Sequence, residues 1–346
     1  MTSSKGIWLR GEANGHEQRT PLVPADAAWL VEQGLSVTVE ESPQRVFPVE
    51  EYADAGCQVV AAETWPGAPP ETVVLGLKEP AATAVALAHH HVFFGHAYKG
   101  QQGGPALLRR FAEGGGTLLD LEYLTDAQGR RVAAFGFWAG YLGAALAVLH
   151  RRGELAVPLE ASTRPGLDAL LGASQGGATA LVIGALGRSG RGACEALAVA
   201  GVTTTRWDVD ETRTLDREAL LDHDLLVNTV FATEPGTPFL TAADLERTDR
   251  RLSVVSDVTC DVTSDCHRLP VYDRVTDWRE PVRRLQSGPA PLDLIAIDNL
   301  PSLLPRESSS AFSADLLPHL AALPVGAPVW DRALRHFHHA RREFEK

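Results

Sequence analysis

Four groups of polar residues follow short apolar runs in the first third of the chain, and their side chains are of types that move protons or bind carboxylates. They are Glu17 with Arg19, Lys78 with Glu79, the set His96, Lys99 and Gln101, and Glu122 with Arg130 and Arg131. Open α/β sheets bind ligands at the carboxyl ends of parallel strands, so we expect these groups to share one sheet edge. A single lysine or histidine there is usually solvated or structural, and the repetition is what indicates a site.

These residue types predict proton transfer beside bound carboxylates. Lys78, among other cations in a partly dry cleft, and His96 are expected to take or return a proton near neutral pH. Arg19, either Arg130 or Arg131, and Lys99 would bind a polycarboxylate substrate, with bidentate geometry available only to arginine. The glutamates would limit the accumulated positive charge. Two proton carriers with a nicotinamide cofactor predict the oxidation of an amine or an alcohol.

A second pattern, later in the chain, is typical of nucleotide binding. A strand predicted at residues 180–183 is followed by a glycine-rich run at 184–192 and a helix predicted at 193–200. Glycines let the backbone turn tightly and approach a pyrophosphate, and a helix N-terminus presents free N–H groups to it. The spacing is G-x-x-G-x-x-G-x-G, which departs from the usual G-x-G-x-x-G. A plain strand-to-helix connection therefore remains an alternative.

Asp208 favours the nucleotide interpretation. It stands at the end of the next predicted strand, twenty-one positions after Gly187, where an acidic side chain accepts hydrogen bonds from the adenosine ribose. A carboxylate in that place also repels a 2′-phosphate. We therefore expect NAD as the cofactor in preference to NADP, with a solvated strand end as the alternative for Asp208.

The elements that must position these residues form two α/β units. Short apolar runs alternate with helix-like segments between residues 6 and 119 and again between residues 180 and 297. This alternation predicts two Rossmann-like, doubly wound parallel sheets, and a length of 346 residues favours two domains. We expect a substrate-side domain at residues 1–136 plus 316–346, an NAD-binding domain at 137–315, and an active-site cleft between them.

Composition excludes several classes of function. The formal net charge is −12, which disfavours nucleic-acid binding, and no apolar stretch approaches the roughly 20 residues of a membrane span. The four cysteines form no C-x-x-C pair and no leader is apparent, so we expect a cytoplasmic protein. We expect no metal, because Cys260, Cys266 and His267 match no common zinc spacing and the histidines at 89–91 alternate between strand faces.

Five motifs, in order between about residues 8 and 323, carry a family resemblance. They are Gly76-Leu-Lys78-Glu79-Pro80, Gly95-His96-Ala-Tyr-Lys99-Gly-Gln101, Asp120-Leu-Glu122 with Gly129-Arg130-Arg131, Val182-Ile-Gly-Ala-Leu-Gly187-Arg188, and Ile297-Asp298-Asn299-Leu300-Pro-Ser-Leu-Leu-Pro-Arg306-Glu307. Together they resemble the NAD-dependent, lysine-forming saccharopine dehydrogenases, which are related to alanine dehydrogenase and transhydrogenase. The resemblance implies two Rossmann-like domains and oxidative deamination of saccharopine to lysine and 2-oxoglutarate.

The same resemblance implies roles for individual residues. Lys78 would accept the proton of the secondary amine, and His96 would act as acid and base when water attacks the imine. Substrate carboxylates would be held by Arg19, Gln101, Arg130 and Arg131. NAD would be held by Gly187, Arg188, Ser189, Asp208, Thr212, Phe231, Val258, Ile297, Asp298, Asn299 and Leu300.

Departures from the family pattern leave alternatives open. Ser189 and Thr229 stand where fungal members carry cysteines, so we expect no disulfide there, and Asn299 replaces a histidine. The connection at residues 151–178 is short, which would alter lid geometry and the choice of amine. A sibling dehydrogenase for alanine or another opine-type amine is therefore an alternative, as is a nucleotide-binding sensor without turnover. The physiological direction and the oligomeric state, monomer or small homo-oligomer, stay open.

Overall fold

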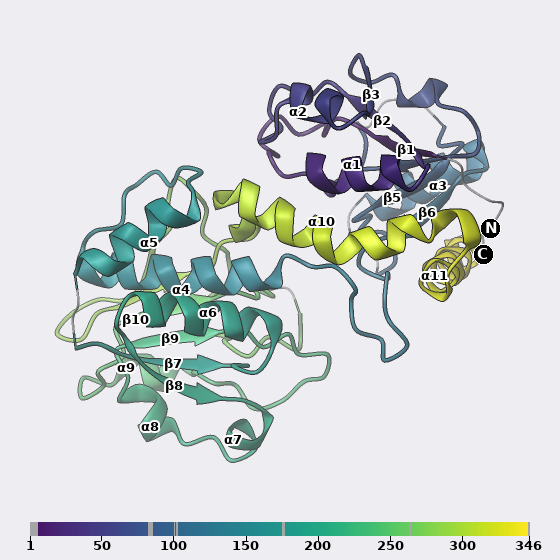
Figure 1. Cartoon of the computed structure of the whole chain (residues 1–346). Coiled ribbons are helices and arrows are strands. Elements are labelled where there is room, and N and C mark those ends of the chain that lie inside the picture. The colour runs from purple at the N-terminus through teal and green to yellow at the C-terminus, as the bar shows by residue number, and fades with distance from the viewer. Residues whose placement is uncertain are drawn as a thin grey trace. The chain divides into compact units, whose positions relative to one another are not determined.

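The chain folds into two compact α/β units (Figure 1). The structure is a computed structural model that describes residues 6–81, 86–99, 101, 103–174, 177–262 and 264–344. The first unit comprises Met1–Ala134 and Ser308–Lys346, and the second comprises Phe135–Glu307. The division passes through helix α10 (Pro305–Ala321), which begins in the second unit and continues into the first.

The first unit is built on a six-stranded parallel sheet in the order β3-β2-β1-β4-β5-β6. Its strands are β1 (Gly6–Leu9), β2 (Ser36–Glu40), β3 (Gln58–Val60), β4 (Thr72–Leu75), β5 (His90–Phe93) and β6 (Thr117–Asp120). Its helices are α1 (Pro24–Glu32), α2 (Val49–Asp54), α3 (Gly104–Gly114), most of α10, and α11 (Pro328–Phe344), with short 3-10 turns at Trp65–Gly67 and Leu323–Val325. The chain thus returns to its first domain at the end.

The second unit is built on a six-stranded sheet in the order β11-β12-β10-β9-β7-β8, in which only β11 runs antiparallel to its neighbour. Its strands are β7 (Thr179–Ile183), β8 (Thr203–Trp207), β9 (Leu225–Asn228), β10 (Val254–Asp257), β11 (Arg283–Gln286) and β12 (Leu292–Ile295). Its helices are α4 (Gly136–Arg152), α5 (Arg164–Ala173), α6 (Arg188–Val199), α7 (Val209–Arg213), α8 (Arg217–Leu221) and α9 (Ala242–Glu246), with a 3-10 turn at Leu300–Leu303. The predicted fold class, two Rossmann-like parallel sheets, is confirmed.

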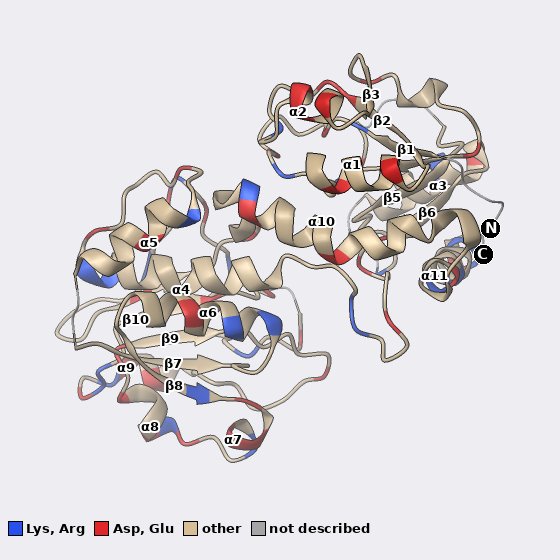
Figure 2. Ribbon diagram, viewed as in Figure 1, with Lys and Arg blue, Asp and Glu red and all other residues tan. Residues whose placement is uncertain are grey.

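Central strands are buried on both faces, which explains their continuous apolar runs. All four residues of β4 and of β9 are buried, as are the last four of β7. Figure 2 shows that charged residues lie mainly in the helices and loops, and β1, β4, β7 and β9 carry none. Three other strands end on a buried acid, namely Glu40, Asp120 and Asp257. These acids must find partners at the sheet edges.

Helices α4 and α6 pack closely in the second unit, where they lie side by side over the sheet (Figure 1). A Cβ at Gly140 of α4 would lie 1.8 Å from the Ser189 carbonyl oxygen, and one at Gly192 of α6 would lie 1.9 Å from the Phe137 carbonyl oxygen. Only glycine permits such an approach of two helix backbones. The crossing fixes the start of α6, which carries the end of the glycine-rich run.

Membrane crossing has no support in the described ranges, since no helix there combines the length and the apolar character that a bilayer span requires.

Candidate active site

The segments that carry Lys78 and His96 run side by side beyond their strands. The Phe94 N–H donates to the Leu77 carbonyl (3.0 Å) and continues the pairing of β4 with β5. Lys78 is the residue after Leu77, and His96 follows Phe94 by two positions. The two predicted proton carriers therefore occupy neighbouring segments at the carboxyl edge of one parallel sheet.

Glu17 and Arg19 form a buried, two-pronged ion pair in the loop that follows β1. The Arg19 Nε donates to Glu17 Oε1 (2.8 Å) and an Arg19 Nη donates to Glu17 Oε2 (2.7 Å). Burial alone would raise the pKa of Glu17, but the hydrogen bonds and charge of Arg19, with a further contribution from the charge of Lys78, lower it. Glu17 is therefore an anion, and Lys78 lies within its electrostatic reach.

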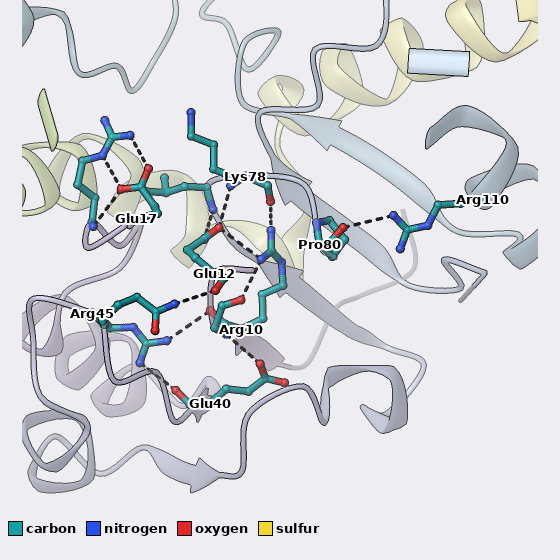
Figure 3. A network of polar contacts seen from close by, with 12 residues as sticks. Arg10, Glu12, Glu17, Glu40, Arg45, Lys78, Pro80 and Arg110 are labelled. Carbon is teal, nitrogen blue, oxygen red and sulfur yellow. Dashed lines mark hydrogen bonds and ion pairs between the residues drawn. The ribbon is translucent and has the colours of Figure 1, made fainter. Parts of the chain in front are cut away.

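Lys78 itself is half-buried, and its backbone is bonded on both sides. The Glu12 carboxylate accepts hydrogen bonds from the Leu77 N–H (2.6 Å) and the Lys78 N–H (3.1 Å), and Arg10 donates to the Lys78 carbonyl (Figure 3). In the part of the chain that the structure describes, the Lys78 ammonium has no hydrogen-bond or ion-pair partner. Sequence reasoning missed Arg10 and Glu12, although both directly follow a strand, as the other candidates do.

His96, Lys99 and Glu122 form a second group. Glu122 Oε2 lies 3.8 Å from His96 Nδ1, and Glu122 Oε1 accepts from Lys99 Nζ at 3.0 Å. The Lys99 N–H donates to Gln101 Oε1 (2.7 Å). Burial would lower the pKa of Lys99, but the hydrogen bond and charge of Glu122 raise it. His96 has a left-handed backbone (φ 47°) and a side chain that is 58% exposed, so it is open to a substrate.

Asp120 holds the backbone of this second group in place through hydrogen bonds, and sequence reasoning missed this residue too. The side chain is fully buried at the end of β6, and its two oxygens accept hydrogen bonds from the Gly95 N–H (3.2 Å) and the Glu122 N–H (2.9 Å). Burial, with the charge of Glu122, raises the pKa of Asp120 to about 7. The signal was present, because Asp120 closes an apolar run immediately before Glu122.

Glu79, Arg130 and Arg131 lie outside these two groups. Glu79 pairs with Arg110 of α3 (3.1 Å). Arg130 is exposed and pairs with Asp126 inside a hairpin, with Nε–Oδ2 and Nη–Oδ2 distances of 2.9 and 2.8 Å. Arg131 belongs to the same hairpin, where its backbone forms an isolated antiparallel β-bridge with that of Thr125. The structure therefore shows two clusters, Glu17–Arg19–Lys78 and His96–Lys99–Glu122, with the arginine hairpin as a third element.

One cavity in this unit is distinct from the two clusters. It has a volume of about 340 Å³ and is lined by the end of β2 and by the loops after β1, β2, β3 and β4, with residues that include Arg10, Glu12, Glu40, Trp65 and Pro80. Neither Lys78 nor His96 lines it. The Glu40 carboxylate already accepts hydrogen bonds from Gly11 N–H, Trp65 N–H and Trp8 Nε1, so these acids hold the loops together.

In the second unit, the glycines of the run 184–192 meet different structural requirements. Gly184 has a φ of 81° and ends β7 in a tight turn, and a Cβ at Gly190 would lie 2.1 Å from the Gly184 carbonyl oxygen. Gly187 has an ordinary φ of −69°, and a Cβ there would meet, among the described residues, only that oxygen at 3.3 Å. The departure from the usual spacing therefore reflects packing at Gly190 and Gly192, while Gly187 faces open space.

Asp208 lies directly beside this turn. It begins α7, and its carboxylate accepts from the Val209 N–H and the Leu186 N–H, both at 2.9 Å. The Thr212 hydroxyl donates back to the Asp208 carbonyl (2.8 Å). Three large apolar side chains of this sheet edge are exposed, namely Leu186, Val209 and Phe231. An acid fixed between exposed apolar side chains and a glycine turn suits an adenosine ribose.

The remaining predicted cofactor residues follow other strands of the same sheet. Arg188 and Ser189 begin α6, Val258 directly follows β10, and Ile297 to Leu300 follow β12. Ile297 and Leu300 are buried, Asp298 is exposed, and Asn299 has a left-handed backbone with a φ of 69°.

A buried polar network at the end of β10 was not expected. Asp257 is fully buried and accepts from Tyr272 (2.7 Å), Asn228 (3.0 Å) and Thr259 (2.7 Å), with His267 Nε2 at 3.3 Å. Burial would raise the pKa of Asp257, but these hydrogen bonds lower it. The network fixes the loop after Val258, and it gives His267 a structural partner.

Comparison with known proteins identifies the family. Residues 8–142 match the family model described as "Alanine dehydrogenase/PNT, N-terminal domain". The chain is 43% identical to the saccharopine dehydrogenase [NAD(+), L-lysine-forming] of Neurospora crassa, across 96% of this chain and 95% of that protein. It is 40% identical to the enzyme of that name from Candida glabrata, across 97% of each chain. The chain belongs to the L-lysine-forming saccharopine dehydrogenase family.

The resemblance expected from the motifs is therefore confirmed. Among solved structures, this saccharopine dehydrogenase family member is similar to an L-alanine dehydrogenase, with a TM-score of 0.68, 17% identity, and coverage of 96% of this chain and 93% of that one. It is also similar to a transhydrogenase from Sinorhizobium meliloti, with a TM-score of 0.64, 15% identity, and coverage of 92% and 95%. These likenesses show the shared fold.

Thr229 and Ser189, the two positions at which no disulfide is expected, both lie close to the start of α6. The Thr229 hydroxyl donates to the Ile183 carbonyl (2.8 Å), and a Cβ at Gly184 would lie 2.8 Å from its oxygen. Ser189 lies beneath Gly136 and Gly140 of α4. The Thr229 hydroxyl therefore packs against the turn at Gly184, and the Ser189 hydroxyl packs against α4 at Gly136.

Proposed function

We propose that this chain catalyses the reversible, NAD-dependent oxidative deamination of saccharopine to L-lysine and 2-oxoglutarate. The observation that carries the proposal is the identity of about 40% to enzymes of that name across nearly the whole chain. Lys78 and His96, on neighbouring segments of one sheet edge, supply the two proton carriers that the reaction needs.

The presence of lysine at position 78 supports this assignment. Only four of the 32 basic residues are lysines, namely Lys5, Lys78, Lys99 and Lys346, and the rest are arginine. Arginine cannot give up its proton in a protein, whereas lysine can. A chain that otherwise uses arginine for its cations keeps lysine at position 78, where the proposed chemistry requires a group that can be neutral.

The proposed steps use this chain's own residues as follows. Neutral Lys78 accepts a proton from the secondary amine of saccharopine. NAD, held by the second unit, would supply the acceptor for the hydride of the glutaryl carbon. His96 then removes a proton from the water that attacks the resulting substrate imine and gives this proton to the lysine nitrogen as the carbon–nitrogen bond breaks. It finally takes the hydroxyl proton of the carbinolamine as the carbonyl of 2-oxoglutarate forms. Lysine and 2-oxoglutarate are the products.

Charged side chains would bind and balance the substrate. We assign its carboxylates to Arg19, Lys99, Gln101 and the Arg130–Arg131 hairpin. Glu17 and Glu122 would offset the cations around Lys78 and His96, because each already pairs with one of them. Glu79 would act indirectly through Arg110.

The second unit fits NAD. Gly187 leaves room for a pyrophosphate at the start of α6, a twelve-residue helix, and Asp208 is held where ribose hydroxyls would be recognised. We assign the rest of the cofactor contacts to Arg188, Ser189, Thr212, Phe231, Val258 and the segment Ile297, Asp298, Asn299 and Leu300. The negative charge of Asp208 supports selection against NADP.

We also propose a reducing compartment such as the cytoplasm, because the cysteines Cys57, Cys194, Cys260 and Cys266 are all unpaired.

One assay tests the proposed function. Adding saccharopine and NAD to the protein should produce NADH, and NADP should be a poor substitute. In the reverse direction, a panel of amines with 2-oxoglutarate and NADH should show preference for lysine. Absence of turnover with saccharopine would overturn the proposal, and preference for another amine would move the enzyme to a sibling activity.

A further inference from the structure

The backbone around Lys78 is clamped by two buried side chains from the loop after β1. Glu12 accepts hydrogen bonds from the Leu77 and Lys78 N–H groups, one on each oxygen, while Arg10 donates to the Lys78 carbonyl (Figure 3). Arg10 and Glu12 also pair with each other at 3.4 Å, with side chains that are 1% and 5% exposed. The Lys78 residue is thus fixed at both its N–H and its carbonyl.

The clamp is itself held in place. Arg10 lies against Gly76, where a Cβ would come within 2.5 Å of the guanidinium, and it stacks over Phe93 at 5.8 Å. Arg45 donates to the Arg10 carbonyl (3.3 Å). Glycine at position 76 is therefore what allows the guanidinium to reach the Lys78 carbonyl.

We propose that Glu12, acting with Arg10, is a positioning residue for Lys78. A lysine ammonium sits on four rotatable bonds, so its placement depends on a fixed backbone origin. Glu12 has a second effect, because its carboxylate balances the buried Arg10 cation near Lys78. Only the expected effect on kcat rests on the proposed function. The effects of the clamp on the placement and the charge of Lys78 do not depend on which reaction the protein catalyses.

Two substitutions separate the two effects. Glu12→Asp keeps the charge but shortens the reach, so it should loosen Lys78 without changing the charge around it. Glu12→Gln removes the charge and also one of the two N–H acceptors, so beyond the loosening that Glu12→Asp shows by itself it should disfavour the protonated form of Lys78. Asp224→Asn is the matched control, because Asp224 also combines an arginine pair with a backbone N–H, from Arg151 and Thr179 of the second unit.

The first measurement is independent of turnover. With only four lysines in the chain, protein carrying ¹³C at the lysine ε-carbons should give few resonances, and Lys78→Ala assigns one of them. The titration midpoint of the Lys78 resonance should fall by about half a pH unit or more in Glu12→Gln. It should stay at the wild-type value in Glu12→Asp and Asp224→Asn. An unchanged midpoint in Glu12→Gln would overturn the charge-balancing role.

The second measurement is the pH profile of saccharopine oxidation. Glu12→Asp should lower kcat by about 10-fold or more with KM near the wild-type value, as expected for a misplaced proton carrier. Glu12→Gln should move the limb of the profile that reports Lys78 in the same direction as the resonance. Wild-type kcat in Glu12→Asp would overturn the positioning role, and this variant carries the test if Glu12→Gln does not fold. Lack of saccharopine turnover in the wild-type protein would instead contradict the proposed function.

Discussion

The Asp208 carboxylate accepts a hydrogen bond from the Leu186 backbone N–H at 2.9 Å, which ties the acid at the end of β8 to the glycine turn after β7. A second bond, from the Val209 N–H, fixes the other oxygen. The ribose-recognising acid and the phosphate-binding turn that we propose are therefore one connected structure.

Replacing Asp208 should weaken NAD binding without affecting the first unit. Asp208→Ala should raise the Kd for NADH by about 10-fold or more, which corresponds to about 1.4 kcal/mol, and should narrow the preference for NAD over NADP. Fluorescence titration with both reduced cofactors measures this. Asp210→Ala is the control, because Asp210 is an exposed acid of the same helix that pairs with Arg213. Equal NADH affinity in wild type and Asp208→Ala would refute the ribose assignment.

Two glycines of the run should respond differently to alanine. In Gly190→Ala the new Cβ would lie 2.1 Å from the Gly184 carbonyl oxygen, so we expect a loss of about 1–3 kcal/mol of stability or more. In Gly187→Ala the methyl group meets little protein, so the fold should persist while NAD affinity falls, because the methyl takes the place of the pyrophosphate.

Thermal unfolding and cofactor titration of both variants decide this. Gly172→Ala on α5 is the control, since no described atom lies within 4 Å of its Cβ position. Normal NAD affinity in Gly187→Ala would show that this glycine does not face the cofactor.

Most strands of both sheets could be predicted because a doubly covered parallel strand is a continuous apolar run between helices, as β4 and β7 are. The antiparallel strand β11 could not, because it carries two arginines and is only partly buried. Lys78 and His96 could be singled out because their side chains are reactive types at strand ends. Glu12 and Asp120 also stand at or after strand ends, but their roles could not be predicted, because both accept hydrogen bonds from backbone N–H groups and no side-chain pattern records which N–H groups lack a partner. The spacing of the glycine run was only partly informative about nucleotide binding, because Gly190 and Gly192 are glycine for reasons of close backbone packing.

Breaking the Glu17–Arg19 pair should be costly for the fold. Arg19→Met leaves a buried carboxylate without its two-pronged partner, and losing one member of a buried pair costs about 3–5 kcal/mol. The double variant Glu17→Gln/Arg19→Met should regain most of that stability, because no buried charge remains. Its KM for 2-oxoglutarate should nevertheless stay raised, since the proposed carboxylate ligand is missing. Urea unfolding and steady-state kinetics measure the two effects, and a wild-type KM in the double variant would remove Arg19 from substrate binding.

The two arginines of the hairpin should differ in their effect on substrate binding. Arg130 is bound to Asp126 through two of its nitrogens, so it is committed to the hairpin. Arg130→Ala should therefore raise the KM for 2-oxoglutarate only slightly, whereas Arg131→Ala should raise it by about 10-fold or more. Steady-state kinetics with 2-oxoglutarate as the varied substrate compares them, and the reverse ranking would assign the carboxylate to Arg130.

Asp120 should make the stability of the protein depend on pH between about 4 and 7. Its pKa in the folded chain is about 7, raised from 3.8 mainly by burial. The folded state therefore holds the Asp120 proton more tightly than the unfolded state does, so this contribution to stability is fully present below pH 4 and is lost as the pH rises through 7. The full effect is about 4 kcal/mol in order of magnitude.

Asp120→Asn removes this titration. An amide can accept only one of the two backbone hydrogen bonds, so the variant should be less stable than wild type at pH 5 by about 1–3 kcal/mol. At pH 8, where wild-type Asp120 is ionised and buried, the difference should shrink or reverse. Urea unfolding from pH 5 to pH 8 measures both curves, with Asp54→Asn at the exposed end of α2 as the control. If wild type and Asp120→Asn lose stability in parallel across this range, Asp120 is not the titrating group, and its two N–H bonds hold it ionised throughout.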